Sequence, residues 1–362
     1  MTANVELQSQ QGKLTESTAR VFLSHVKQIF TARPFKPHPA FTGGHAQTLV
    51  AYVWPRRAGL KCDDEERLFE VEPGIRVLAH CRWQSNPTAH PTLLLWHGME
   101  GSTSSIYMLG TAHKAFQAGL NVLLVNLRNC GGTEQLSPTL YHGGLSGDLR
   151  AVVSELIERD RLPRLFVAGF SLGGNMVLKL AAEYGDDPPA EVHGICAISP
   201  AVDLDASTRA INQRSNWIYQ QSFVRNMRKR VRVMQQFYPE RYDLSRLHLV
   251  RTVIDFDEHF TAVSHGFAGA ADYYQKSSSI RLLDRIRIPT LIIHAEDDPF
   301  IPFAPLLHPS IATNPYILLV ATAHGGHVAF IAAKTDHEDR FWSENRLVEF
   351  CQLAEAGKVS DP

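Results

Sequence analysis

The chain has 362 residues, of which 44% are hydrophobic and 20% charged, a balance typical of a globular protein with a sizeable core. Its 36 basic and 37 acidic side chains nearly cancel, which argues against nucleic acid as a partner. The five cysteines are scattered and odd in number, so neither a disulfide framework nor a zinc site is expected. Because no apolar run approaches the roughly 18 residues of a membrane-spanning helix, we expect a soluble, cytoplasmic protein.

Strand-like and helix-like segments alternate through most of the chain. A hairpin is predicted at 66–83, with Pro73-Gly74 at its turn. Short apolar runs predict six buried strands, at 92–98, 121–128, 164–170, 192–200, 289–295 and 316–323. Helical spacing predicts helices at 104–118, 146–160, 172–184 and 341–356. The alternation indicates an α/β fold, in which a mostly parallel eight-stranded sheet carries helices on both faces.

One interval breaks this alternation. Between residues 203 and 287 no long apolar strand occurs, and charged and aromatic residues recur at helical spacing. We therefore expect a helical cap at 203–287, inserted between a first part of the core with an N-terminal extension, 1–202, and a second part, 288–362.

A serine lies on the predicted corner between a strand and a helix. The stretch Gly169-Phe170-Ser171-Leu172-Gly173 follows the strand at 164–170 and opens the helix at 172–184. A corner this sharp strains its central residue and requires neighbours without side chains, and it exposes the serine hydroxyl at the end of the strand. The alternative is a glycine turn whose serine merely caps the helix.

A histidine and an acid follow in the order expected for activating such a serine. A base must take the serine proton during attack, and a carboxylate must orient that base. His327, after Gly325-Gly326, is the predicted base, while His324 is the rival and is assigned a structural role. Asp298 is the predicted acid because of the turn that follows it, and Asp297 is then expected to stabilise the turn. The two histidines alone are weak evidence for a metal, and none is predicted.

Acyl transfer also needs N–H donors for the developing oxyanion. The backbone N–H of Leu172, directly after the serine, is one candidate. The loop His97-Gly98-Met99 follows an early strand, and the Met99 N–H is the predicted second donor. Because the carboxyl ends of parallel strands meet at one edge, all these residues are expected to form one site.

The segment 222–237 predicts a basic amphipathic helix. Its apolar face carries Val224, Met227, Val231 and Met234, and a neighbouring face carries Arg225, Arg228, Lys229 and Arg232. We expect the apolar residues to pack on the body of the protein and the cations to face solvent. The alternative is a peripheral contact with anionic lipid through the cap.

Several long motifs, in one order, resemble the α/β-hydrolase superfamily and, within it, the YheT-like or AB hydrolase 4 family of esterases and lipases. They are FTGGHAQTL (41–49), HGMEGSTSS (97–105), NLRNCGGTE (126–134), LYHGGLSGDLRAVV (140–153), FDEHFTAVSHGFAGAADYY (256–274) and DDPFIP (297–302). The chain departs from the family pattern at Asn129, where glycine is usual, and at Gly147, where an acid is common.

The resemblance implies a serine hydrolase that cleaves carboxylic esters, either short- to medium-chain acyl esters or acylglycerols, through an acyl-enzyme. No cofactor is implied, and the partner is a small ester or lipid substrate; the sequence does not indicate an oligomeric state. The same catalytic residues would also serve an acyltransferase or a thioesterase. A non-catalytic binding protein on a hydrolase scaffold is a further alternative, although such scaffolds usually lack a catalytic residue.

Overall fold

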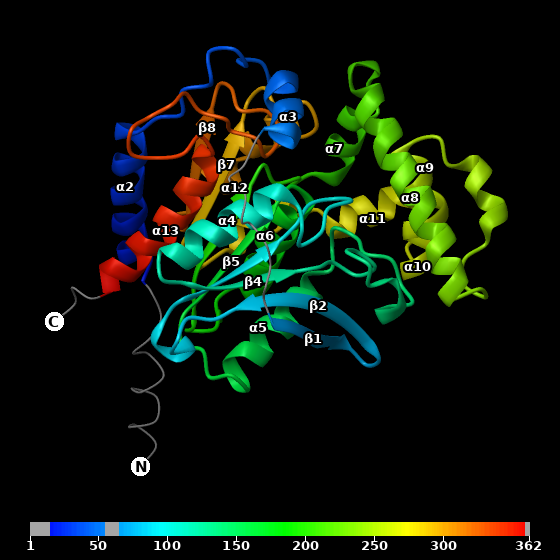
Figure 1. Ribbon diagram of the computed structural model, residues 1–362, viewed down its shortest axis with the longest axis horizontal. Coiled ribbons are helices and arrows are strands. Elements are labelled where there is room, and N and C mark those ends of the chain that lie inside the picture. The colour runs from blue at the N-terminus through cyan, green and yellow to red at the C-terminus, as the bar shows by residue number, and fades with distance from the viewer. Residues whose placement is uncertain (1–14, 55–64, 359–362) are drawn as a thin grey trace.

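A computed structural model describes residues 15–54 and 65–358, with an eight-stranded sheet at the centre (Figure 1). The strands are β1 (Glu65–Glu72), β2 (Ile75–Arg82), β3 (Thr92–Trp96), β4 (Asn121–Val125), β5 (Leu165–Phe170), β6 (Val192–Ile198), β7 (Thr290–Ala295) and β8 (Ile317–Thr322). Their spatial order is β1-β2-β4-β3-β5-β6-β7-β8. The pairs β1–β2 and β2–β4 are antiparallel, and the other pairs are parallel. The predicted hairpin, the six further strands and the mostly parallel sheet are confirmed. The prediction that all six strands are buried is wrong for β8, which is only partly buried because it lies at the edge of the sheet and pairs with β7 alone.

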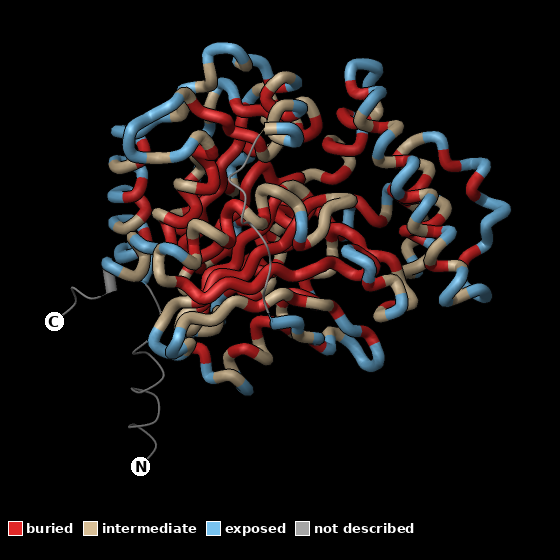
Figure 2. Tube along the Cα trace, viewed as in Figure 1, coloured by how far each residue is buried: buried red, intermediate tan, exposed pale blue. Residues whose placement is uncertain are grey.

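The central strands are short apolar runs because both of their faces are covered. Every residue of β3, β4, β5 and β7 is buried, and Figure 2 shows the buried residues concentrated along these strands. In β2, near the antiparallel edge, the more buried residues alternate with less buried ones, as expected where one face is partly solvated.

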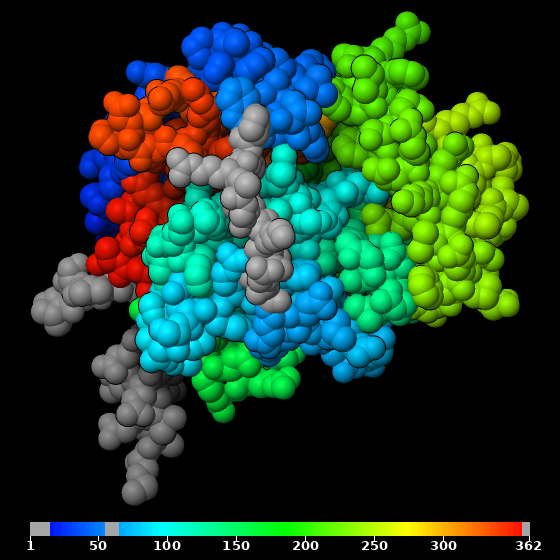
Figure 3. Space-filling view, in the orientation of Figure 1, coloured from blue at the N-terminus to red at the C-terminus, as the bar shows by residue number. Residues whose placement is uncertain are grey.

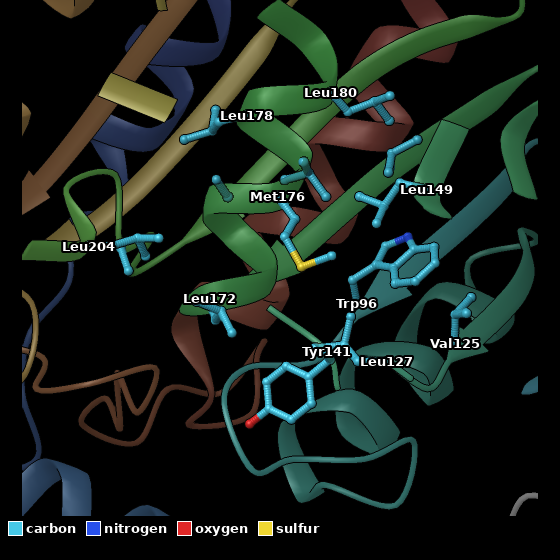
Figure 4. Close-up of a cluster of buried hydrophobic side chains, with 14 of the residues drawn as sticks. Trp96, Val125, Leu127, Tyr141, Leu149, Leu172, Met176, Leu178, Leu180 and Leu204 are labelled. Carbon is cyan, nitrogen blue, oxygen red and sulfur yellow. The ribbon is translucent and has the colours of Figure 1, made fainter. Parts of the chain in front are cut away.

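Helices cover the sheet in two layers. On one face, α2 (Glu16–Ala32), α4 (Ile106–Gln117) and α13 (Trp342–Lys358) pack on the strands. On the other face lie α5 (Ser146–Glu158) and α6 (Leu172–Tyr184). There Trp96 of β3 meets Leu149 and Met176 in the core cluster shown in Figure 4. The four predicted helices are confirmed to within two residues at each end.

Two N-terminal helices were not among the predicted elements. The first is α2, whose buried residues Ala19, Leu23, Val26 and Phe30 have helical spacing. The second is α3 (Gly44–Val53), a short helix whose N-cap residue, Gly43, makes no side-chain capping bond. The spacing in α2 is a signal that the sequence carries, whereas α3 depends on contacts with distant loops.

The interval between β6 and β7 is helical, as predicted. It contains α7 (Leu204–Ile211), α8 (Trp217–Phe237), α9 (Val253–Phe256), α10 (Ala262–His265) and α11 (Ala270–Ser277). These elements gather on one side of the molecule, at the right of Figures 1 and 3. The predicted apolar face of α8 is buried, while Arg225, Lys229 and Arg232 are exposed. The remaining short helix of the core, α12 (Pro309–Ala312), lies beside β8.

Of the five cysteines, Cys62 lies outside the described residues, and Cys130, Cys196 and Cys351 are buried thiols. Within residues 15–54 and 65–358, no helix combines the length and the apolar character that crossing a membrane requires.

Candidate active site

Ser171 occupies a strained corner between β5 and α6. Its backbone angles are φ 55° and ψ −115°, a conformation that L-residues rarely adopt. A Cβ atom on Gly169 would lie 2.2 Å from the carbonyl oxygen of Gly173, and one on Gly173 would lie 2.6 Å from that of Trp96. Both glycines are therefore required for the close approach of strand and helix. The Ser171 side chain makes no capping bond to α6, so the structure does not show the simple capped turn.

Ser171, His327 and Asp298 form one chain of hydrogen bonds. Nε2 of His327 lies 2.9 Å from Oγ of Ser171, and Nδ1 lies 2.8 Å from Oδ2 of Asp298. Because the carboxylate can only accept, Nδ1 carries the proton and Nε2 accepts from the serine hydroxyl. The three residues come from the ends of β5, β7 and β8, which the parallel sheet brings to one edge.

The Asp298 carboxylate is buried but well supplied with donors. Its side chain is 0% exposed, and its Oδ1 accepts the N–H groups of Phe300 at 2.8 Å and Ile301 at 3.0 Å. Burial alone would raise the pKa of Asp298, but attraction to His327 and the hydrogen bonds hold the pKa below its usual value. The group is therefore ionised at neutral pH and can hold the His327 ring in one tautomer.

The neighbouring acid and histidine support the loop. Oδ1 of Asp297 accepts the Gly326 N–H at 2.9 Å, and Oδ2 lies 3.2 Å from Nδ1 of His324. His324 is about half exposed. The geometry thus pairs His327, and not His324, with Ser171, and it pairs Asp298, and not Asp297, with His327.

Helix α3 contributes contacts to the site that the sequence analysis did not assign. Thr48 Oγ1 accepts the backbone N–H of His327 at 2.9 Å. Gln47 bonds both the N–H and the carbonyl of Ile331, just beyond the histidine loop. A Cβ atom on Gly44 would lie 1.9 Å from the carbonyl oxygen of Asp297, so glycine is required there. Gly44, Gln47 and Thr48 lie in the motif FTGGHAQTL (41–49). The resemblance of this motif to a family motif was the signal in the sequence that could have marked them as part of the site.

The loop after β3 lies beside Ser171, since a Cβ atom on Gly98 would be 3.0 Å from the Ser171 Cβ. Nδ1 of His97 donates to the carbonyl of Gly98 at 2.8 Å, and the Gly101 N–H bonds the same carbonyl at 3.1 Å. Since the C=O and N–H of a trans peptide point in opposite directions, the Met99 N–H points away from His97. Among the described residues, neither this N–H nor that of Leu172 has a hydrogen-bond acceptor, and both residues line a cavity with Ser171.

The His97 ring is a neutral support for this loop. Burial lowers the pKa of His97 to about 4, so the ring stays uncharged at neutral pH. Its Nε2 accepts the Leu127 N–H at 3.0 Å, which leaves the proton on Nδ1 for the Gly98 carbonyl.

Two largely apolar cavities meet at Ser171. The first lies between Leu172 of the core and Leu204, Met227 and Phe256 of the helical interval. The second is bordered by His327 and includes Ile106, Tyr107 and Phe223. Both are lined by Met99, Ser171, Ile211 and Ile301. In the part of the chain that the structure describes, no group of three or more His, Cys, Asp or Glu side chains could hold a metal ion.

Comparison with known proteins identifies the family. The model of the alpha/beta hydrolase fold matches residues 91–333. YheT of Escherichia coli K12 is 29% identical over 337 residues, which cover 92% of this chain and 97% of YheT. Monoacylglycerol lipase of Saccharomyces cerevisiae is 30% identical over 275 residues, 73% of this chain and 60% of the lipase. The solved structure of the Pyrococcus furiosus esterase Pf2001 shares the fold, with a TM-score of 0.53 at 16% identity over 82% of this chain and 97% of that one.

The sheet order, the strand-to-helix corner and the family match define an enzyme of the α/β-hydrolase class. Within that class, the chain belongs to the YheT-like family of esterases and lipases, and its activity is that of a carboxylic ester hydrolase.

Proposed function

We propose that the protein cleaves carboxylic esters with Ser171 as nucleophile, His327 as general base and Asp298 as the orienting acid. The observation that carries the proposal is the continuous hydrogen-bonded chain from Ser171 Oγ through the His327 ring to the Asp298 carboxylate. As Oγ attacks the ester carbonyl carbon, Nε2 takes the hydroxyl proton. The ionised carboxylate stabilises the imidazolium that results.

The backbone N–H groups of Met99 and Leu172 are proposed to bind the oxyanion. Both line the cavity that contains Ser171, and neither has a protein acceptor among the described residues. When the tetrahedral intermediate collapses, the C–O bond to the alcohol breaks and His327 returns its proton to the leaving oxygen. Water then repeats the sequence on the acyl-enzyme, so that the carboxylic acid is released and Ser171 is regenerated.

The position of His327 supports a proposal for the roles of the two cavities. Because Nε2 must reach the leaving oxygen, the cavity bordered by His327 is proposed to take the alcohol part of the ester. The cavity between Leu172 and Leu204 is then proposed to take the acyl chain. Residues 203–287 contribute to both cavities through Ile211, so we propose that this interval acts as a cap over the substrate.

The proposed substrates are short- to medium-chain acyl esters or acylglycerols. Both cavities are lined mainly by apolar side chains, which suits an acyl chain and a small alcohol. The similarity to a monoacylglycerol lipase supports glycerol as one candidate alcohol.

A panel of nitrophenyl esters from acetyl to palmitoyl, followed by monoacylglycerols, tests this proposal. We expect turnover by the wild type that depends on acyl length and is lost in Ser171→Ala. A matched serine control is Ser104→Ala, since Ser104 is exposed on the loop before α4. Turnover that persists in purified Ser171→Ala would assign the activity to another residue.

A further inference from the structure

Glu100, the residue after Met99, holds an unusual conformation in a buried place. Its φ is +57°, in the left-handed region that a residue with a Cβ rarely occupies. Its side chain is only 5% exposed, and Oε2 lies 3.1 Å from a guanidinium nitrogen of Arg230 in α8. A carboxylate thus lies buried directly beside the proposed oxyanion donor, and its charge partner comes from the helical interval between β6 and β7.

The Tyr141 hydroxyl forms hydrogen bonds with both the backbone and the side chain of Glu100. The tyrosine hydroxyl accepts the Glu100 N–H at 3.0 Å and donates to Oε1 of the same residue at 2.8 Å. The guanidinium carbon of Arg230 lies 5.1 Å from the centre of the Tyr141 ring. Glu100 is therefore held at its backbone N–H and at both carboxylate oxygens. The Tyr141 ring in turn contacts the guanidinium of Arg230, the charge partner of Glu100.

Arg230 also reaches the loop after β4. It donates to the backbone carbonyl of Asn129, another residue with a positive φ, of 59°. A single guanidinium from α8 therefore joins two strained loops at the carboxyl edge of the sheet. Its side chain is 10% exposed, so the ion pair is largely shielded from water.

Loss of the guanidinium would remove the charge partner of Glu100 and leave the two bonds to the Tyr141 hydroxyl as its remaining support. Left-handed backbone is unfavourable for a residue with a Cβ such as glutamate, and an unpaired buried carboxylate is also strongly unfavourable. Both effects favour movement of Glu100 toward water. Because the residue follows Met99 directly, such movement would shift the Met99 N–H relative to Ser171.

We propose that Arg230 of the helical interval is a positioning residue. It holds Glu100 and thereby fixes the Met99 N–H in the orientation that binds the oxyanion. The inference rests on the proposed function of Ser171 and Met99. It means that the oxyanion site is complete only when α8 is docked, so the helical segment contributes to catalysis as well as to the walls of the cavities.

The test compares Arg230→Met and Arg230→Lys with Arg232→Gln. Arg232 is exposed on the same helix and serves as the matched control. Active sites are first counted by complete labelling with a fluorophosphonate. A wild type that is not labelled at Ser171 would contradict the proposed function itself. If every variant is labelled completely, all variants have the same number of active sites, and any difference in rate or affinity is due to Arg230.

Two ketones with the same octyl chain then distinguish a displaced oxyanion donor from damage to the acyl cavity. Ser171 adds to a trifluoromethyl ketone and gives a hemiketal whose oxyanion occupies the donors, with the serine proton on His327. The matching methyl ketone binds without appreciable addition. We expect Arg230→Met to lower kcat and trifluoromethyl ketone affinity together, each by about 10- to 100-fold. KM and methyl ketone affinity should stay within about twofold, Arg230→Lys should recover part of the loss, and Arg232→Gln should match the wild type.

Three results would overturn the proposal. They are equal losses for both ketones, a change in KM alone, and wild-type kcat in Arg230→Met. Should Arg230→Met fail to fold, Tyr141→Phe offers a milder variant, because it removes the hydroxyl bonds to Glu100 but keeps the ion pair. The same selective loss of trifluoromethyl ketone affinity, of about three- to tenfold, is expected there, and equal affinity to the wild type would contradict the inference.

Discussion

Thr48 of α3 holds the backbone of His327: its Oγ1 accepts the histidine N–H at 2.9 Å and donates to the Gly44 carbonyl at 2.7 Å. Thr48 is 1% exposed, so water cannot readily replace this bond. A helix near the N-terminus therefore supports the loop that carries the proposed base, almost 280 residues later in the chain.

We predict that Thr48→Val lowers kcat by about tenfold and the free energy of unfolding by about 1–3 kcal/mol, because a buried N–H loses its acceptor. Steady-state kinetics and urea unfolding measure the two effects. Thr31→Val is the control, since Thr31 is exposed and makes a comparable bond to the Lys27 carbonyl at 2.7 Å. Wild-type kinetics in Thr48→Val would show that the histidine loop does not need this support.

The two adjacent aspartates should differ sharply in their effect on catalysis. Asp298→Asn should lower kcat by on the order of 10³- to 10⁴-fold, since the amide no longer stabilises the imidazolium or the correct tautomer. Asp297→Asn should cost far less, because an amide oxygen can still accept the Gly326 N–H. Comparison of kcat at saturating substrate decides the matter, and a larger loss in Asp297→Asn would reverse the assignment.

A buried acid in the helical interval should give the stability a distinct pH dependence. Burial raises the pKa of Asp257 from 3.8 to about 6, although Tyr274 and Thr261 donate to its oxygens. The folded state therefore keeps a proton that the unfolded chain releases. The contribution of Asp257 to the free energy of unfolding is therefore full below about pH 4 and is lost as the pH rises through about 6.

We predict that the free energy of unfolding of the wild type, relative to Asp257→Asn, falls by roughly 2–3 kcal/mol between pH 4 and pH 7. Urea unfolding of both proteins across this range gives the difference. The exposed Asp284, changed to Asn, is the control and should give a nearly flat difference. A flat curve for Asp257→Asn as well would mean that Asp257 ionises normally in the folded protein.

The basic face of α8 should behave as a solvated surface. Arg228 is half-buried and bonds the Leu247 carbonyl at 3.0 Å, so it has a structural role, whereas Arg225, Lys229 and Arg232 are exposed. We predict that a variant with these three changed to glutamine cosediments with anionic vesicles to the same extent as the wild type. Each cation at a lipid surface can contribute on the order of 1 kcal/mol, so markedly weaker binding by the variant would establish the lipid contact instead.

The sequence predicted those parts of the structure that depend on local pattern. Apolar runs marked the strands, and the glycines around Ser171 marked the corner, because each follows from the sterics of a few neighbouring residues. Patterns of this kind do not reveal which distant groups meet. The bond from Thr48 to His327 and the pairing of Arg230 with Glu100 join residues 279 and 130 positions apart. Nothing in the spacing of segment 222–237 distinguishes Arg230, which lies beside the buried Glu100 carboxylate only because of the fold.

The identity of the nucleophile is the central claim, and covalent labelling tests it most directly. The wild type is treated with a fluorophosphonate, and the modified peptide is identified by mass spectrometry, with Ser171→Ala and Ser104→Ala treated in parallel. The account predicts one adduct, on Ser171, that is absent from Ser171→Ala and retained in Ser104→Ala. An adduct on another residue, or equal labelling of the wild type and Ser171→Ala, would contradict it.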